Sequence, residues 1–325
     1  MKLHENPRLY RQALQATADF MNIREVYIEK DYWVTIALKK IFSDPIGEDV
    51  VFKGGTALSK CYGIIPRFSE DIDLVIRRRN SETDNSMKKK LKQISELVAT
   101  EFPEIKIENV TRKYGLNRKT AHQYVKSTSG NFGQVRDFII VESSWMGHPE
   151  PSVRMELSSY IYTMMVAKNQ DKIAETYDLT PFPVQVLSVE RTLCEKIMSL
   201  VRFSYSAEPL ISLALKIRHA YDVHQMLQDE NIKMFLSSAR FDDMLITVRN
   251  EDRITFKSNN DWIAKHPSEA LLFKDLDNVW FDLKNAYEVD FRAMVYGDFP
   301  IHDEVYESLN EIRKRLRSIS WSITV

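Results

Sequence analysis

The strongest constraint on the fold of this chain is a short segment that joins an apolar run, two adjacent glycines and a later Asp-x-Asp pair. Residues 50–52 are apolar, Gly54 and Gly55 follow closely, and Asp71 and Asp73 lead into a second apolar run. Only nine of the 325 residues are glycine, whereas the usual share is about 7%. An adjacent pair therefore indicates a turn where a side chain would be in the way. The pattern predicts a strand, a glycine turn with a helix, and a second strand that begins with carboxylates.

Asp71 and Asp73 are two residues apart, so in a strand their side chains point to the same face. Their Cα atoms would lie about 7 Å apart, given a rise of about 3.3 Å per residue. Carboxylate oxygens suit Mg²⁺, which proteins usually bind through one or two carboxylates together with substrate phosphates. An isolated Asp-x-Asp is more often a solvated turn, but backbone N–H groups at Gly54 and Gly55 could approach a phosphate closely. Together these features favour a site for a nucleoside triphosphate (NTP) with Mg²⁺.

A longer pattern surrounds these residues. Residues 53–60 read Lys-Gly-Gly-Thr-Ala-Leu-Ser-Lys, and residues 67–74 read Arg-Phe-Ser-Glu-Asp-Ile-Asp-Leu. The pattern resembles motif I of the DNA polymerase β-type nucleotidyltransferases, and its longer form resembles the AbiEii/AbiGii toxins of type IV toxin–antitoxin systems. The resemblance implies an α/β (α+β) fold: a polymerase β-like domain with a short mixed sheet flanked by helices, and a C-terminal helical domain. The residues it assigns to nucleotide binding are Lys53, Gly54, Gly55, Thr56, Arg67 and Ser69.

A third carboxylate, on a strand beside the Asp-x-Asp strand, completes the metal site in this superfamily. Residues 138–144 read as a strand, and Glu142 lies near its end in an otherwise apolar run. Glu156 is the competing candidate. We favour Glu142 because residues 149–160 resemble the family's continuation, although a glutamate there can also mark a sheet edge. With Asp71 and Asp73, it would hold Mg²⁺ in a site with room for two metal ions.

A second group of candidate residues lies on predicted helices. Ser188 is expected to cap a helix that carries Lys196, and Asp222 follows on another helix. Arg218 and Asp222 are four residues apart, which by itself indicates only an ordinary ion pair within a helix. The resemblance instead implies that Lys196 reaches the triphosphate and that Asp222 orients Lys196 or the acceptor.

The remaining organisation follows from periodicity and from turn residues. Prolines at 181 and 183 place the boundary between a domain at 1–178 and a helical domain at 179–325. Thr56 is a candidate cap for the helix that follows the glycines. Helices are expected at 8–22, 23–42, 56–62 and 81–98, and strands at 50–52, 106–111, 121–126 and 138–144.

Composition limits the class of protein. The chain is 44% hydrophobic and 28% charged, which suits a large core and a water-exposed surface. It contains no run of about 18 apolar residues that could span a membrane, and residues 1–7 lack the apolar region of a signal peptide. Cys61 and Cys194 show no spacing typical of a disulfide framework or a zinc site. We therefore expect a cytoplasmic protein.

The acceptor is less constrained than the donor. Residues 77–126 contain 13 Lys and Arg against 6 Asp and Glu, interleaved with aromatic residues. This favours a nucleic-acid surface and a solvated helix with an exposed hairpin equally. The resemblance implies transfer to an RNA end, such as a tRNA 3′ hydroxyl, with arrested translation and an antitoxin partner that represses transcription. A protein or small-molecule acceptor remains an alternative, as does a non-catalytic nucleotide-binding module, which would not need two clustered carboxylates.

Overall fold

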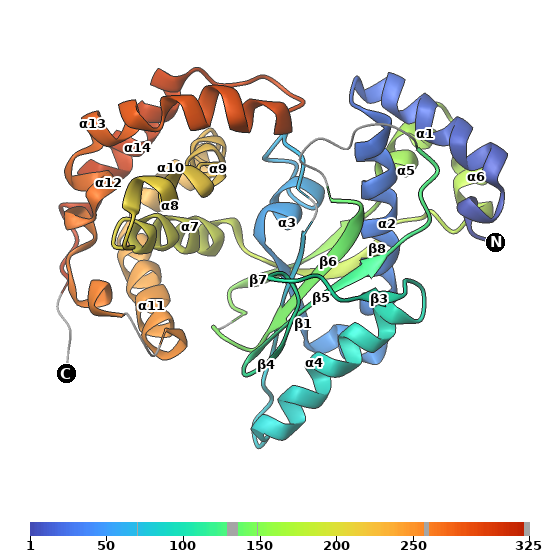
Figure 1. Ribbon diagram of the computed structural model, residues 1–325, viewed down its shortest axis with the longest axis horizontal. Coiled ribbons are helices and arrows are strands. Elements are labelled where there is room, and N and C mark those ends of the chain that lie inside the picture. Colours follow the sequence, from blue (N-terminus) through green and yellow to red (C-terminus); the bar gives the residue numbers. More distant parts are fainter. Residues whose placement is uncertain (70, 129–135, 148, 257–259, 322–325) are drawn as a thin grey trace. The chain divides into compact units, whose positions relative to one another are not determined.

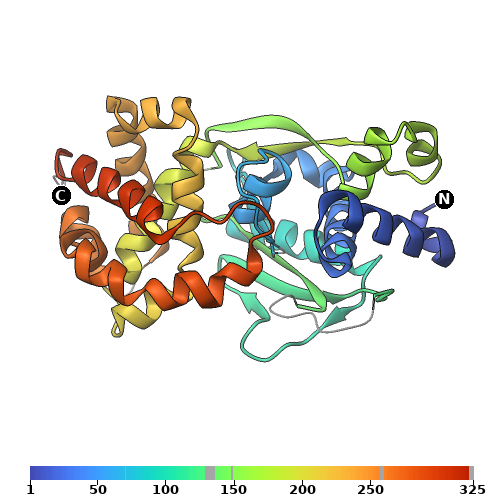
Figure 2. The same ribbon diagram turned by 90° about the horizontal axis from the view of Figure 1, so that it is seen from above.

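The computed structural model describes residues 1–69, 71–128, 136–147, 149–256 and 260–321 (Figure 1 and Figure 2). Contacts along the backbone divide the chain into two compact units. Unit 1 comprises Met1–Gly63 and Phe68–Leu187, and unit 2 comprises Ile64–Arg67 and Ser188–Val325. Unit 2 therefore takes a short segment from within the sequence of unit 1.

Unit 1 is built on a mixed eight-stranded sheet in the order β3-β5-β6-β2-β1-β8-β7, with β4 also paired to β5. The β2–β6 and β1–β8 pairs are parallel, and the other pairs are antiparallel. This confirms the expected mixed sheet. The strands are β1 (Val50–Lys53), β2 (Asp71–Ile76), β3 (Glu104–Ile105), β4 (Arg112–Tyr114), β5 (Asn117–Gln123), β6 (Phe138–Ser144), β7 (Ser152–Leu157) and β8 (Phe182–Leu187).

Helices flank this sheet, also as expected. Helix α2 packs against β6 and β8, and α4 packs against β2, β5 and β6. Side-chain caps begin several of these helices: the side chain of Thr83 accepts a hydrogen bond from the first turn of α4, and that of Ser159 does the same for α5. The helical elements of unit 1 are η1 (Leu3–Glu5), α1 (Pro7–Met21), α2 (Glu25–Phe42), η2 (Pro45–Asp49), α3 (Gly54–Lys60), α4 (Asp84–Ala99), α5 (Tyr160–Ala167) and α6 (Asp171–Thr176).

Two buried charged residues of α2 fix neighbouring segments. Lys30 Nζ donates to the carbonyl oxygens of Arg136, at 2.8 Å, and of Phe138. Asp31 forms an ion pair with Lys60 at the end of α3 and accepts a backbone hydrogen bond at the start of α5. Because buried charges are tolerated only when they are paired, α2 sets the positions of the starts of β6 and α5 and the end of α3.

Unit 2 is helical, and its described residues contain no named strand, in agreement with the expected C-terminal helical domain. Helix α7 packs against α9 and α11, and α14 packs against α9. The elements are α7 (Val189–Phe203), α8 (Pro209–Leu215), α9 (Arg218–Met226), α10 (Glu230–Leu236), α11 (Ala239–Thr255), η3 (Asp261–Ala264), η4 (Pro267–Glu269), α12 (Leu271–Lys274), α13 (Leu276–Asp282), a π-helical segment η5 (Ala286–Phe291), η6 (Arg292–Met294) and α14 (His302–Leu316).

The segment Ile64–Arg67 is attached to unit 2 through its backbone. Arg67 forms an isolated antiparallel bridge with Val295. The Pro66 carbonyl accepts hydrogen bonds from the backbone N–H groups of Tyr296 and Gly297, at 3.1 and 3.2 Å. These backbone contacts explain why the four residues group with helices that follow much later in the sequence.

The division after Leu187 lies later than residues 178–179, where we expected it. Residues 182–187 form β8 rather than part of a helical domain, because this strand pairs with β7 and with β1. Pro183 is the second residue of β8, and a proline is tolerated near the start of a strand. The two prolines therefore mark the entry to a strand.

Two further local predictions are wrong. Residues 106–111 form a turn, in which Asn109 has a φ of 60° and the N–H groups of Val110 and Thr111 donate to the Ile107 carbonyl. A left-handed residue interrupts a strand, and asparagine adopts this conformation more readily than most residues. The helix after the glycines begins at Gly54, so Thr56 lies within its first turn and is not its cap.

Candidate active site

The Asp-x-Asp strand has the predicted two-faced character. In β2, the side chains of Ile72 and Leu74 are buried, whereas Asp71 and Asp73 are half-buried. Residues alternate between faces along a strand, so the two carboxylates lie together on the face opposite the two apolar side chains. Helices α2 and α4 pack against the central strands of this sheet and contribute to its apolar core.

Four charged residues form a line across neighbouring strands of this face. Asp73 in β2 is opposite Lys53 in β1 and opposite Glu142 in β6. Glu142 is in turn opposite Lys119 in β5. Directly opposed residues in a sheet share a face, so the line reads positive, negative, negative, positive. We call these four residues the charge row.

Glu142 is held by two donors from β5. Its Oε1 accepts a hydrogen bond from Asn117 Nδ2 at 2.9 Å, and its Oε2 forms an ion pair with Lys119 Nζ at 2.8 Å. Burial would raise the pKa of Glu142, but the hydrogen bonds and charges of Lys119, then Asn117 and Lys53, hold this pKa below its usual value. Glu142 therefore stays ionised at neutral pH.

The competing carboxylate lies elsewhere in the sheet. Glu156 is an exposed residue of β7, opposite Pro183 in β8. Strands β8 and β1 separate β7 from β2. The structure thus brings Glu142, and not Glu156, next to Asp73.

Asp71 also has a cationic partner: its Oδ1 forms an ion pair with Arg136 Nη1 at 2.9 Å. Among the described residues, no group of three His, Cys, Asp or Glu side chains is arranged to hold a metal ion. The donor set nevertheless fits a hard divalent cation, because Asp71, Asp73 and Glu142 present only carboxylate oxygens from one face of two paired strands. Glu70, the other acidic residue of this motif, lies outside the described residues.

The two glycines occupy the start of α3, directly after Lys53. Gly54 has a φ of +80°, a conformation that favours glycine. A Cβ atom at this position would overlap Asp73 Oδ2. Gly54 therefore allows the backbone of α3 to pass against the carboxylate, and Gly55 continues the first turn, whose N–H groups have no partner within the helix.

Thr56 and Ser69 connect this turn to β2. Thr56 is buried, and its Oγ1 donates to the carbonyl oxygen of Asp71 at 2.6 Å. Its Oγ1 also lies 3.0 Å from Ser69 Oγ, within hydrogen-bonding distance. These hydroxyls hold the first residue of the carboxylate strand against α3.

In unit 2, one buried carboxylate is shared by two cations. Asp222 in α9 is fully buried; Arg67 donates to it through Nε at 2.6 Å and Nη2 at 2.8 Å. Lys196 Nζ in α7 lies 2.6 Å from Asp222 Oδ2. We call these three residues the Asp222 cluster. We expected Arg67 to bind a nucleotide, but its guanidinium forms a two-point ion pair with Asp222.

Burial acts in opposite directions on the pKa values of this cluster. For Asp222, burial would raise the pKa, but the charges and hydrogen bonds of Arg67 and Lys196 hold it well below its usual range. For Lys196, burial lowers the pKa most; Asp222 opposes this shift, and Arg67 adds to it. With one anion between two cations, Lys196 carries the less favourable charge.

The helix that carries Lys196 begins as predicted: the Ser188 side chain accepts a hydrogen bond from the Arg191 N–H at 3.2 Å. Arg191 itself is buried and forms a two-point ion pair with Glu251 of α11. It therefore joins two helices of unit 2. The ion pairs of Asp222 found in the described part of the chain go to the Asp222 cluster, and none goes to Arg218.

A family model described as "Nucleotidyl transferase AbiEii toxin, Type IV TA system" matches residues 36–311. The chain belongs to the AbiEii family. Its fold is similar to that of MenT4, a nucleotidyltransferase toxin from Mycobacterium tuberculosis H37Rv, with a TM-score of 0.51 and 16% identity over 94% of this chain and 90% of that one. Comparison with curated proteins gives no match.

This AbiEii-family chain is therefore a nucleotidyltransferase of a type IV toxin–antitoxin system. Membership implies an NTP substrate, a divalent metal and an antitoxin partner. No described helix combines the length and apolarity that a membrane crossing would need.

Sequence reasoning missed the role of three residues beside the carboxylates of this AbiEii protein. The sequence indicates Lys119 only as part of a basic stretch and Asn117 only as a residue of a polar turn, although Asn117 begins β5; no pattern indicates Arg136. Their contacts with Glu142 and Asp71 depend on strand pairing, which no local pattern reveals. They line a pocket of about 310 Å³ together with other residues. The lining residues are Asn109, Val110, Arg112, Asn117, Lys119, Arg136, Ile140 and Glu142.

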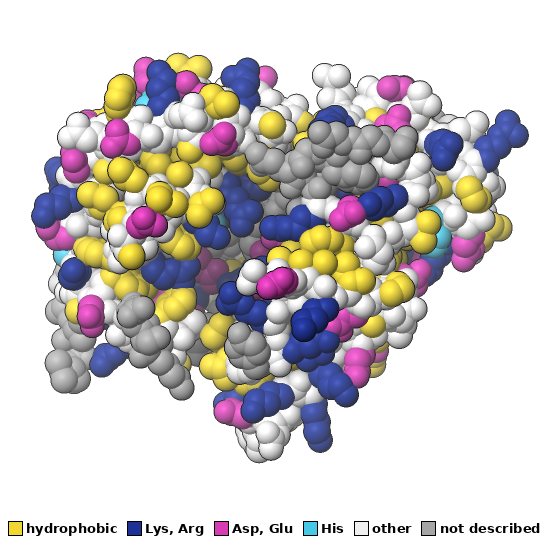
Figure 3. Space-filling model, viewed as in Figure 1, with side chains coloured by type: hydrophobic (Ala, Val, Ile, Leu, Met, Phe, Trp, Pro, Cys, Tyr) yellow, Lys and Arg dark blue, Asp and Glu magenta, His cyan; other side chains and the backbone are white. Residues whose placement is uncertain are grey.

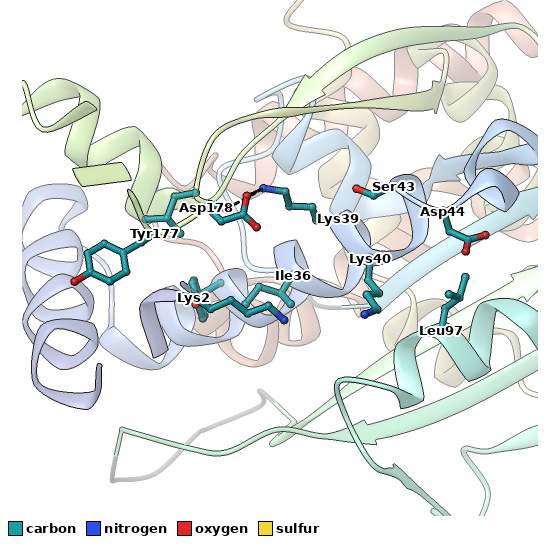
Figure 4. A pocket seen from close by; sticks show the side chains of 11 residues that line it. Lys2, Ile36, Lys39, Lys40, Ser43, Asp44, Leu97, Tyr177 and Asp178 are labelled. Carbon is teal, nitrogen blue, oxygen red and sulfur yellow. Dashed lines mark hydrogen bonds and ion pairs between the residues drawn. The ribbon is translucent and has the colours of Figure 1, made fainter. Parts of the chain in front are cut away.

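A larger pocket of about 460 Å³ lies on another part of unit 1, where α2 and α4 meet the segment before β8 (Figure 4). Lys39 Nζ crosses one side of it to form an ion pair with Asp178 at 2.6 Å. Lys40 and Ile36 also face it (Figure 4). It shares no lining residue with the charge row.

Proposed function

We propose that this AbiEii-family enzyme transfers a nucleotide from an NTP to a hydroxyl of an RNA acceptor, such as a tRNA 3′ end. The reaction would depend on Mg²⁺ and would arrest translation. The observation that carries this proposal is the pair Asp73 and Glu142, directly opposed on paired strands, with Asp71 two residues before Asp73 on the same face. A module that only bound nucleotides would have no use for three carboxylates beside anionic phosphates.

Asp71, Asp73 and Glu142 would hold Mg²⁺ at this face. When bound, Mg²⁺ supplies Lewis-acid activation of the acceptor hydroxyl and neutralises charge on the leaving pyrophosphate. The N–H groups of Gly54 and Gly55 would bind triphosphate oxygens, since the turn brings the backbone against Asp73. Lys53, Thr56 and Ser69 would support the same phosphates, with Thr56 and Ser69 also fixing the start of β2.

Lys196 would neutralise negative charge that develops on the phosphate oxygens during transfer. Asp222 would orient its ammonium group through their 2.6 Å contact. The two-point contact of Arg67 with Asp222 supports a different role from direct phosphate binding. Arg67 would act as a positioning residue that holds both carboxylate oxygens of Asp222 through two parallel N–H donors of its planar guanidinium.

Cations on the surface of unit 1 support a polyanionic acceptor. Figure 3 shows Lys and Arg side chains gathered over α4 and the β4–β5 hairpin. Within the described residues, no ion pair is seen for Lys88 and Lys89 of α4 or for Arg112 of β4, and all three are exposed. The pocket beside Glu142 also contains three cations. An acceptor that is a cationic small molecule would instead require an acidic pocket.

By family resemblance, we also propose that the antitoxin is a separate chain that represses transcription, and that the enzyme acts in the cytoplasm. Neither point depends on the geometry of the site. Binding of the purified partner chain to the promoter DNA of its own gene would support this proposal, whereas a complex of the two chains that lacks transferase activity would contradict it.

The activity can be tested with α-³²P-labelled NTPs, Mg²⁺, and either total RNA or total protein as the acceptor. We expect label on RNA, loss of label in EDTA, and loss of label in Asp73→Asn. Asp84→Asn, which removes an exposed carboxylate from α4, is the matched control and should label RNA normally. Label only on protein would contradict the RNA proposal, and the absence of label on both would contradict the transfer proposal.

A further inference from the structure

Two of the three carboxylates in the candidate site form ion pairs with cations that line the pocket beside Glu142. Lys119 of β5 contacts Glu142 at 2.8 Å, and Arg136, which lies just before β6, contacts Asp71 at 2.9 Å. The Lys119 and Glu142 side chains are 27% and 33% exposed, so their charges are only partly screened by solvent. Both cations line the pocket of about 310 Å³ beside Glu142.

The charge balance of this face changes when a divalent cation binds. Adjacent strands lie about 4.8 Å apart, so the three carboxylates repel one another unless cations lie between or beside them. Lys119 and Arg136 provide such cations, and Lys53 lies opposite Asp73. A divalent cation would compete with Lys119 and Arg136 for the same carboxylate oxygens and would repel both side chains.

The two ends of the charge row differ in their surroundings. At the β1 end, Lys53 is followed directly by the glycine turn against Asp73. At the β5 end, Lys119 adjoins a pocket that also contains Arg112, its neighbour in β4. The glycine end suits the triphosphate of the donor. The β5 end therefore has cations and space for an anion of the other substrate.

We propose that Lys119 and Arg136 are exchangeable counterions. They hold Glu142 and Asp71 in the metal-free enzyme, and they pass to a phosphate group of the acceptor when the divalent cation takes the carboxylates. This inference rests on the proposed function, because it assumes that Asp71 and Glu142 are metal ligands. It adds that the acceptor carries a phosphate close to its reactive hydroxyl, and that this phosphate occupies the pocket beside Glu142.

The first test measures metal binding without any substrate. Mn²⁺ is titrated by calorimetry, at low ionic strength, into the wild type, Lys119→Gln and Arg136→Gln. Each variant should bind Mn²⁺ about fivefold more tightly, since a partly exposed ion pair contributes up to about 1 kcal/mol. Lys113→Gln is the matched control: it removes a lysine of β4 whose partner is Glu104, and its Mn²⁺ affinity should equal that of the wild type.

The second test uses steady-state kinetics with RNA as the acceptor. Lys119→Gln and Arg136→Gln should raise KM for the acceptor at least about threefold, because a phosphate contact is lost. KM for the NTP should stay within about twofold of the wild-type value. Purely structural residues would change neither Mn²⁺ affinity nor the ratio of the two KM values.

The outcomes separate the two proposals. If the wild type transfers nucleotides and binds Mn²⁺, but Lys119→Gln and Arg136→Gln bind Mn²⁺ no more tightly, the counterion proposal is overturned and the proposed function stands. If neither the wild type nor Asp73→Asn binds Mn²⁺, the proposed metal site fails and the counterion proposal fails with it. Thermal unfolding curves of both variants that match that of Lys113→Gln show that either result concerns the site and not the fold.

Discussion

The Asp222 cluster contains one buried anion and two cations. We therefore expect substitution of the anion and substitution of a cation to change the stability of unit 2 by different amounts. Asp222→Asn removes the negative charge that accepts three short hydrogen bonds and replaces one acceptor oxygen by an NH₂ donor, so the charges of Arg67 and Lys196 are left unbalanced. Removing one partner of a buried ion pair costs about 3–5 kcal/mol. Because a domain has a total stability of about 5–15 kcal/mol, we expect Asp222→Asn to lower the melting temperature of unit 2 by roughly 10 °C or more.

Lys196→Met should behave differently. It leaves the two-point contact of Arg67 with Asp222 intact, as a balanced pair. Burial, together with Arg67, lowers the pKa of Lys196. The folded protein therefore binds the proton of the Lys196 ammonium group less tightly than the unfolded chain does. The charged ammonium group destabilises the fold until the pH rises past about 10.5, the pKa of the lysine in the unfolded chain. We expect an unfolding free energy at neutral pH equal to that of the wild type or up to about 1 kcal/mol higher.

Urea unfolding followed by circular dichroism, together with the RNA-labelling assay, tests both variants. Lys196→Met should fold as stably as the wild type and lose nucleotide transfer, whereas Asp222→Asn should lose both stability and transfer. Lys233→Met, which removes a half-buried lysine of α10, controls for the substitution itself. The reasoning is refuted if Lys196→Met is destabilised as much as Asp222→Asn, since Lys196 would then be the main counterion of Asp222.

Two further predictions concern unit 1. Gly54→Ala should lower the free energy of unfolding by about 1–3 kcal/mol, because residue 54 has a left-handed backbone, and should abolish transfer, because the new Cβ would displace the Asp73 carboxylate. The control is Gly115→Ala, at a φ of +73° in open space, which should lose stability but keep transfer. Equal transfer activities of the two variants would contradict this account. Glu142→Gln should be less stable than the wild type at pH 7, because the pKa of Glu142 is lower in the folded protein than in the unfolded chain. The ionised carboxylate therefore stabilises the fold above the unfolded-chain pKa of about 4.3, and this contribution is lost as the pH falls through the pKa of the folded state. The difference in melting temperature should therefore shrink from pH 7 to pH 3, and a difference independent of pH would point to packing instead.

The local part of the site could be predicted from the sequence because it depends on short spacings. Asp71 and Asp73 share a face through the alternation of a single strand, and Gly54 provides the conformation that a residue with a Cβ would adopt only under strain. Glu142 was chosen over Glu156 through family resemblance, and the register of β2 with β6 places it opposite Asp73. No rule on residue spacing could supply that register.

The less predictable part depends on contacts between distant residues. The family resemblance assigns Arg67 to nucleotide binding, but its guanidinium contacts Asp222, 155 positions later in the sequence. Likewise, Lys119 appeared as one cation in a basic stretch, although its ion pair with Glu142 follows from the β5–β6 pairing. In both cases the type of residue suggested an anionic partner, and the tertiary fold determined which anion it was.

The assignment of Ile64–Arg67 to unit 2 limits how this enzyme can be recombined with its relatives. A chimera joined once, between Leu187 and Ser188, would take Arg67 from one parent and Asp222 from the other, and would separate Pro66 from the Gly297 against which it packs. An exchange of the helical unit therefore needs three junctions, so that residues 64–67 move together with residues 188–325. Although the two units are compact, neither is one continuous segment of the chain.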